Sequence, residues 1–169
     1  MIHKLLYLLD ANVLITAKNT YYAMDRVPEF WAWLAHHGGL GNVKIPEEIY
    51  DEVKDGSDEL ADWLKEDDIS AALRLQEQVD VALVRAVIAE GYAPDLRDDE
   101  LQKVGRDPFL IAYALADPED RVVVTTEVSK PTRNRGNCHI PDVCIHFELA
   151  CTDTFGLARQ LDFKTSWNT

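Results

Sequence analysis

Two short apolar runs constrain the fold more than any other feature of this sequence. Residues 4–9 form a near-continuous apolar stretch, and residues 121–125 read RVVVT, which is rich in β-branched side chains. Runs of this kind are typical of strands that are covered on both faces in a parallel sheet. Because helical patterns alternate with the strands, the sequence predicts an α/β fold, a three-layer α/β/α sandwich with a central, mainly parallel sheet.

Helical patterns fill the stretches between the strands, and Asp10 turns the chain from the first strand toward a helix. Prolines and capping residues mark the expected starts of helices, and glycines mark the expected ends. Ser70 is expected to cap one long helix that runs to Glu90. Loops are expected over residues 18–26 and 130–137. Helices are predicted over residues 28–37, 47–54, 58–66, 70–90, 96–104, 109–116, 140–147 and 154–161, and further strands over residues 43–45 and 149–151.

Length and composition indicate one domain. The 169 residues, 47% of them apolar, suffice for a single domain over residues 1–169, with a tail from about residue 163. No signal peptide is expected, because Asp10 ends the first apolar run. No apolar stretch approaches the ~20 residues that a bilayer requires, so we expect a cytoplasmic protein without a membrane segment. Cys138, Cys144 and Cys151 are compatible with reduced, packed thiols.

The formal net charge of -13 is unexpected for a protein that handles nucleic acid, because binding to a polyanion usually draws on a basic surface. Bound metal, a local basic loop or a basic partner would each reconcile this acidity with such a function. A solvated surface that keeps the protein soluble explains it equally well.

Acidic residues follow the two best strands. Asp10 comes directly after the first strand, and Glu127 comes two residues after VVVT. Because the carboxyl ends of parallel strands meet at one edge of the sheet, both residues are expected there. Thr125 is suited to hydrogen-bond a carboxylate or a phosphate. Taken singly, Asp10 could equally cap the next helix, and Glu127 could be an ordinary surface residue.

Further acids lie on the predicted helices. Glu52 lies beside the apolar stripe of its helix, and Glu48 lies one turn earlier on the same side, so the sequence leaves open which of them faces a site. Asp107 precedes a proline in the manner of a helix cap. Asp142 lies in the first turn of its predicted helix, where a favourable interaction with the helix dipole is enough to explain an acidic residue. Hydrolysis with Mg²⁺ or Mn²⁺ needs three or more carboxylates that converge from different elements.

The order and context of these acids resemble the PIN-domain ribonuclease family, over nearly the whole chain. An aspartate follows the first strand, a glutamate lies in a later helix, an aspartate opens another helix, and an acid follows a VT strand. The matching stretches are residues 7–15 (YLLDANVLI), 45–53 (IPEEIYDEV), 107–114 (DPFLIAYA) and 122–127 (VVVTTE). Residues 19–22 (NTYY) and 140–144 (IPDVC) also resemble an uncharacterised prokaryotic PIN-like group.

The resemblance implies a role for each matched residue. Asp10 corresponds to the first metal-binding aspartate of the family, and Asn12 to a neighbour that orients ligands. Glu52 and Asp107 correspond to the second and third acids. Glu127 takes the place of a fourth acid, where aspartate is commoner. The second matching group adds Asp142 as a weaker metal ligand.

The resemblance also implies a function. Asp10, Glu52, Asp107 and Glu127 would hold Mg²⁺ or Mn²⁺ for the hydrolysis of RNA phosphodiesters, without a side-chain nucleophile. PIN-like chains of this size resemble toxins of toxin–antitoxin pairs, which implies an RNA substrate, an antitoxin partner and a homodimer.

The only dense basic run, with Lys130, Arg133 and Arg135, suits phosphate contacts next to the cut. A solvated loop is the alternative interpretation of these three cations.

Three other functions compete with an endoribonuclease. A haloacid-dehalogenase-type phosphatase needs a second aspartate two residues after the first, and this chain has Asn12 there. A non-catalytic PIN-like binding module would suit the net acidity, although all four acids are retained. A structure-specific DNA nuclease remains open, although the chain has little room for the usual DNA-binding extensions.

Overall fold

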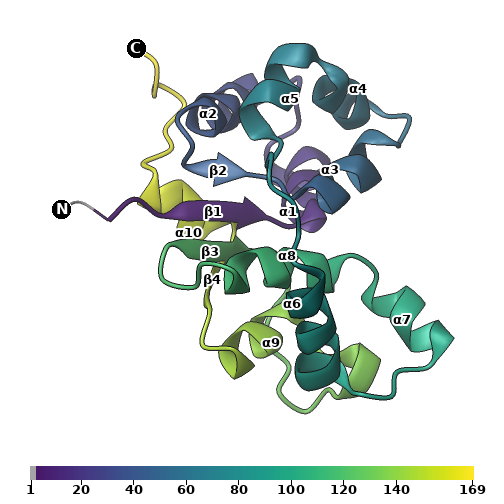
Figure 1. Cartoon of the computed structure of the whole chain (residues 1–169). Helices are drawn as coiled ribbons and strands as arrows, with labels where there is room; N and C mark the ends of the chain where they lie inside the picture. The colour runs from purple at the N-terminus through teal and green to yellow at the C-terminus, as the bar shows by residue number, and fades with distance from the viewer. Residues whose placement is uncertain (1–2) are drawn as a thin grey trace.

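A four-stranded parallel sheet lies at the centre of the molecule (Figure 1), in a computed structural model that describes residues 3–169. Its strands are β1 (Leu6–Leu9), β2 (Val43–Lys44), β3 (Arg121–Val124) and β4 (Ala150–Thr152). They lie in the order β2-β1-β3-β4, and every pair is parallel. The strand order reverses at β1, so the carboxyl ends of β1 and β3 form the switch point where such sheets place ligands. The predicted α/β class is confirmed.

Helices cover both faces of this sheet and complete the α/β/α sandwich. On one face α8 (Asp107–Leu115) packs against β1 and β3, while α10 (Thr154–Gln160) lies behind the sheet in the view of Figure 1. α2 (Pro28–Gly39) packs against β2, and α9 (Ile140–His146) packs against β4. The remaining α-helices are α1 (Ala11–Thr16), α3 (Glu47–Lys54), α4 (Glu59–Lys65), α5 (Asp67–Leu73), α6 (Val81–Ala86) and α7 (Asp98–Val104).

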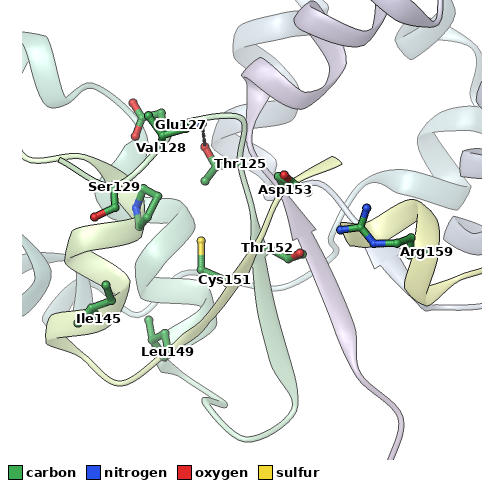
Figure 2. Close-up of a pocket in the computed structure, with 11 residues that line it drawn as sticks. Thr125, Glu127, Val128, Ser129, Ile145, Leu149, Cys151, Thr152, Asp153 and Arg159 are labelled. Atoms are coloured by element: carbon green, nitrogen blue, oxygen red, sulfur yellow. Dashed lines mark hydrogen bonds between the residues drawn. The ribbon is translucent and has the colours of Figure 1, made fainter. Parts of the chain in front are cut away.

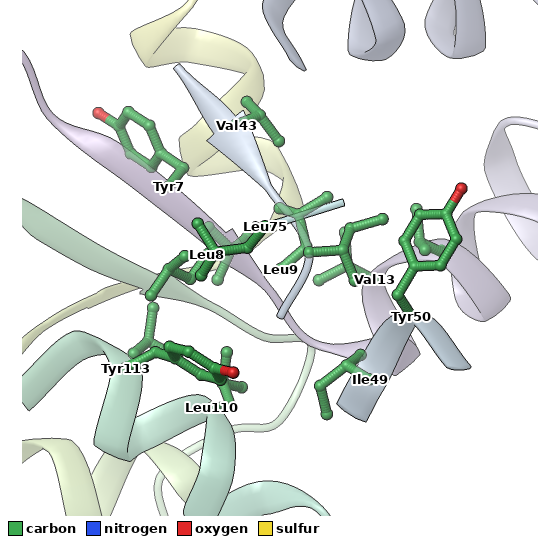
Figure 3. Packing of buried hydrophobic residues seen from close by; sticks show 14 of the residues in the cluster. Tyr7, Leu8, Leu9, Val13, Val43, Ile49, Tyr50, Leu75, Leu110 and Tyr113 are labelled. Atoms are coloured by element: carbon green, nitrogen blue, oxygen red, sulfur yellow. The ribbon is translucent and has the colours of Figure 1, made fainter. Parts of the chain in front are cut away.

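The core forms where α8 meets the two central strands. Leu8 and Leu9 of β1 are fully buried, and Figure 3 shows them beside Leu110 and Tyr113 of α8. Because both faces of β1 are covered, its residues are apolar in succession and do not alternate with polar ones. The aromatic side chains of α2 are also buried in this core: Phe30, Trp31 and Trp33.

The prediction of one long helix over residues 70–90 is wrong. α5 ends at Leu73, because the chain then pairs with the outer side of β2: Ile45 N–H donates to Leu73 O, and Leu75 N–H donates to Ile45 O. α6 begins only at Val81, where Asp80 accepts from two backbone N–H groups and caps the new helix. A long-range strand pairing therefore overrides a local helical pattern.

The loop expected over residues 18–26 begins later than the sequence suggested. α1 continues as the π-helical segment η1 (Ala17–Tyr21), in which Tyr22 N–H reaches back to Ala17 O. A second π-helical segment, η2 (Val87–Tyr92), extends α6 in the same way. The basic loop over residues 130–137 contains one short 3₁₀ turn, η3 (Arg135–Asn137).

The tail from residue 163 packs against α2. Phe163 places its ring 5.1 Å from that of Trp33, and Trp167 Nε1 donates to Glu29 O at 3.0 Å. The three cysteines are free thiols, and Cys144 is buried. Over residues 3–169, no helix combines the length and the apolar character that crossing a membrane requires.

Candidate active site

A hydrogen-bonded network joins the ends of β1 and β3. Thr125 Oγ1 donates to Asp10 Oδ2 at 3.0 Å and accepts from Asn12 Nδ2 at 3.2 Å. Asn12 Oδ1 accepts from Thr126 N–H at 3.0 Å. The two strands are paired up to their last residues, so the next residue of each, Asp10 and Thr125, meet. Asn12 thereby holds the turn after β3 against Asp10.

Asp10 is a buried acid whose pKa is affected by neighbouring acids. It is only 5% exposed, and although it holds the N-cap position of α1, its side chain makes no capping hydrogen bond to the helix. Burial raises the pKa of Asp10 to about 6, against the hydrogen bond from Thr125, and the charges of Glu127 and Glu52 raise it further. The ionised form of Asp10 is therefore disfavoured unless a cation compensates it.

Asp107 lies at the start of α8 and belongs to the same cluster. Arg106, and not Asp107, holds the cap position of α8, so the cap interpretation of Asp107 is wrong. Burial raises the pKa of Asp107 to about 8, together with the charges of Asp10, Glu127 and Glu52. The fold has brought four acids from distant parts of the chain within electrostatic reach of one another.

The two glutamates of α3 have different surroundings. Glu52 is exposed, and its charge acts on both Asp10 and Asp107. Glu48 accepts a hydrogen bond from the Tyr113 hydroxyl at 3.2 Å, and its charge is not among those that shift Asp107. Of the two candidates that the sequence left open, Glu52 is the one that faces the other acids.

Glu127 and Asp142 are tied to the beginning of α9. Glu127 Oε2 accepts from Ile140 N–H at 2.7 Å, although its charge still reaches Asp10 and Asp107. Asp142 accepts from Lys130 N–H at 2.7 Å and from the Ser129 hydroxyl. The carboxylate of Asp142 is thus engaged in holding the loop before α9, and the structure does not bring it into the cluster of four acids.

The four acids fit a divalent cation in donor chemistry and in charge. Carboxylate oxygens are the ligands that Mg²⁺ and Mn²⁺ prefer, and a cation would offset the burial and the repulsion that raise the pKa of Asp10 and Asp107. Within residues 3–169, however, no three His, Cys, Asp or Glu side chains lie close enough to form a ready metal-binding group. Glu127 is turned toward Ile140, so the carboxylates would have to converge on the ion.

The basic loop divides into two parts. Arg135 is bound to Glu100 and Asp95 through side-chain contacts at 2.8–3.0 Å, so it fastens η3 to α7 and is not free for phosphate. Lys130 and Arg133 are exposed and make no ion pair among the described residues. Phosphate contact therefore remains a prediction for Lys130 and Arg133.

A pocket of about 550 Å³ beside Glu127 contains a cation that the sequence analysis did not single out. Figure 2 shows Glu127 and Arg159 at opposite sides of this pocket, with Thr125, Cys151 and Thr152 between them. Arg159 lies on α10 and forms no ion pair within residues 3–169. No local pattern marked it, because its helix resembled an ordinary closing helix.

Tyr92, at the end of η2, is a second residue that the sequence did not reveal. It is 7% exposed, and its hydroxyl has no hydrogen-bond partner among the described residues. Burial, followed by the charges of Asp107 and Glu127, raises the pKa of this hydroxyl far above its usual range.

Gly91 lets η2 approach α9, because a Cβ at this position would lie 2.7 Å from Val143 Cγ1.

The fold and the cluster of acids define an α/β protein with an acidic edge at the sheet's switch point. The chain belongs to the family described as "Domain of unknown function (DUF4411)", whose sequence model matches residues 7–165. All four acids of the cluster lie within the matched range. No curated protein and no solved structure matches the chain.

Proposed function

We propose that the protein is a metal-dependent endoribonuclease that hydrolyses RNA phosphodiester bonds with Mg²⁺ or Mn²⁺. The observation that carries this proposal is that the charges of Glu52 and Glu127 act on both Asp10 and Asp107 at one sheet edge. Asp10 makes no side-chain capping hydrogen bond and Asp107 does not hold the cap position, so capping hydrogen bonds do not account for the placement of these two acids. A cation-dependent reaction accounts for it, because the cation compensates the charge.

The side chains have separate tasks under this proposal. Asp10 and Asp107 would bind the cation from the centre of the cluster, and Glu52 and Glu127 would complete its ligands. Thr125 and Asn12 would keep the Asp10 carboxylate in place through the hydrogen bonds described above. When bound, the cation would lower the pKa of a water and stabilise charge on the phosphate oxygens. No side chain of the protein needs to act as nucleophile.

The RNA backbone would approach from the side of Glu127. Lys130 and Arg133 on the loop after β3, together with Arg159 in the adjoining pocket, supply free positive charge on a protein with a net charge of -13. Such contacts fix the register of a nucleic acid on a protein without reading its sequence.

The further proposal that the chain is the toxin of a toxin–antitoxin pair, restrained by an antitoxin and paired as a homodimer, is supported by the resemblance to PIN-type toxins. If so, induced expression will arrest growth, and the Asp10→Asn variant will not. Arrest by both forms would contradict this role of the acids.

The proposed activity is tested by incubating wild type and Asp10→Asn with RNA and with single-stranded DNA, in Mn²⁺, Mg²⁺ or chelator. We expect wild type to cleave RNA only with metal, and Asp10→Asn to lose cleavage while its melting temperature stays within a few degrees of wild type. Full activity in Asp10→Asn would overturn the assignment. Cleavage of DNA alone would favour the DNA nuclease, and metal binding without any cleavage would favour a binding module.

A further inference from the structure

A small, largely apolar pocket lies at the carboxyl edge of the sheet, beside Thr126 and Asp153, which follow β3 and β4. It has a volume of about 200 Å³ and lies between the end of η1 and the start of α10, next to the turn after β3. Its walls are Thr16, Tyr21, Thr126, Asp153, Thr154 and Phe155. Neither the metal cluster nor the basic loop accounts for this pocket.

Two aromatic rings form the apolar wall. Tyr21 and Phe155 lie with ring centroids 4.9 Å apart and their planes tilted by 47°. Tyr21 also packs edge to face on Tyr22, which stacks on the buried Phe30 at 4.3 Å, so the core holds the platform from behind. Phe155 is nevertheless 44% exposed. A rigid aromatic surface that is open to solvent can stack with another flat ring.

The pocket is connected to Asp10 by hydrogen bonds. The backbone N–H of Thr126, a wall residue, donates to Asn12, Asn12 donates to Thr125, and Thr125 donates to Asp10. A ligand in the pocket would therefore lie next to Thr126, whose backbone is held by the same network that holds Asp10.

A polar group inside the pocket has no partner. Thr154 is 1% exposed, and its hydroxyl is buried without a hydrogen bond among the described residues. Buried hydroxyl groups are nearly always hydrogen-bonded, so an unsatisfied one in a ligand-sized pocket points to a polar atom supplied from outside. Asp153 Oδ1 already accepts from Gly156 N–H at 2.7 Å and caps α10, and no cationic side chain lines the pocket. This chemistry favours a neutral ring with polar edge atoms over a phosphate.

We propose that this pocket binds one unpaired nucleobase of the substrate strand, next to the bond that is cut, with the base stacked on Phe155 and Tyr21. A base within a duplex is already stacked and paired, so the pocket would select single-stranded nucleic acid. The inference rests on the proposed nuclease function for the identity of the ligand, and it adds the class of substrate.

The experiment measures binding separately from cleavage. Fluorescence anisotropy follows a labelled single-stranded oligonucleotide and the matching duplex in Ca²⁺, with wild type, Phe155→Ala and Phe155→Trp. The control is Leu101→Ala, which removes a comparably exposed apolar side chain, 39% exposed, from α7. Since stacking contributes about 1–3 kcal/mol per base, Phe155→Ala should weaken single-strand binding about 5–150-fold. Phe155→Trp should bind the single strand about as tightly as wild type, and so should Leu101→Ala. The affinity for the duplex should be the same in all variants.

The possible failures are distinguishable. If Phe155→Ala binds the single strand as tightly as wild type, or if wild type binds the duplex as tightly or binds neither probe, the base pocket is overturned. If single-strand binding depends on Phe155 but wild type cleaves no nucleic acid in Mn²⁺, the pocket stands and the proposed nuclease function fails. Circular dichroism on each variant identifies a change in binding that is caused by misfolding.

Discussion

The hydroxyl of Thr125 donates a 3.0 Å hydrogen bond to the carboxylate of Asp10, and this contact joins the ends of the two central strands. Both residues are almost completely buried. The bond lowers the pKa of Asp10, while burial and the neighbouring charges raise it to about 6. Thr125 is therefore the main side-chain partner that holds this acid in place when no cation is bound.

Replacing Thr125 with valine should destabilise the protein. The change leaves Asp10 without its donor, and it leaves Asn12 Nδ2 and Glu127 N–H without their acceptor. Buried polar groups that lose a partner cost about 1–3 kcal/mol. Urea unfolding should show a loss of this size for Thr125→Val and a smaller one for Thr125→Ser, which keeps the hydroxyl. Equal stability of Thr125→Val and wild type would show that the network contributes little.

Replacing Asp107 with asparagine should stabilise the metal-free protein at neutral and alkaline pH. The pKa of Asp107 is raised from 3.8 in the unfolded chain to about 8 in the folded protein, so the folded state favours the protonated form. The contribution of Asp107 to the free energy of unfolding is therefore most favourable below pH 4, and it is lost as the pH rises to about 8. The variant should gain on the order of 2 kcal/mol at pH 8 and little at pH 4.

Thermal melts in chelator across this pH range measure the difference between Asp107→Asn and wild type. A gain that does not grow with pH would contradict the account of Asp107 as a half-buried acid beside other negative charges. With Mn²⁺ present the order should reverse, because wild type gains a ligand-binding contribution to its stability.

The two glutamates of α3 provide a matched pair. If Glu52 is a metal ligand, Glu52→Gln should reduce the rate of metal-dependent cleavage. Loss of a residue that only hydrogen-bonds a metal ligand reduces activity roughly 10–100-fold, so loss of the ligand itself should cost at least as much. Glu48→Gln should stay close to wild type, because Glu48 accepts from Tyr113. Initial rates at saturating Mn²⁺ compare the two variants. The opposite ranking would assign the ligand to Glu48.

The basic loop should contribute to RNA affinity through two of its three cations. Lys130→Gln and Arg133→Gln should each reduce the slope of log affinity against log salt by about 0.7, the value for one phosphate contact on a single strand. Arg135→Gln should leave the slope unchanged and weaken the attachment of η3 to α7, because Arg135 binds Glu100 and Asp95. Unchanged slopes in the first two variants would exclude the loop as the contact.

Much of the fold could be predicted from the sequence, because buried parallel strands are continuous apolar runs. Asp10 and Glu127 could be placed at one sheet edge for the same reason. Asp107 was harder to assign, since an aspartate before a proline has the same local pattern whether it caps a helix or faces a site. Only the position of α8 in the folded protein distinguishes the two.

Features that depend on long-range contacts could not be predicted. The helix expected over residues 70–90 is interrupted because Leu73 and Leu75 pair with Ile45, a contact that no local periodicity encodes. The aromatic wall of the small pocket likewise joins Tyr21 and Phe155 from opposite ends of the chain. Tyr21 lies in the NTYY stretch, but nothing in the sequence indicates that its ring meets that of Phe155.

Direct measurement of Mn²⁺ binding tests the central claim, that the clustered acids form a divalent-cation site. Free Mn²⁺ can be followed by electron paramagnetic resonance during titration into chelator-stripped wild type, Asp10→Asn and, as a control, Glu48→Gln. We expect saturable binding to wild type and to Glu48→Gln, and binding to Asp10→Asn that is at least about tenfold weaker. Equal binding by wild type and Asp10→Asn, or no saturable binding to wild type, would contradict the account.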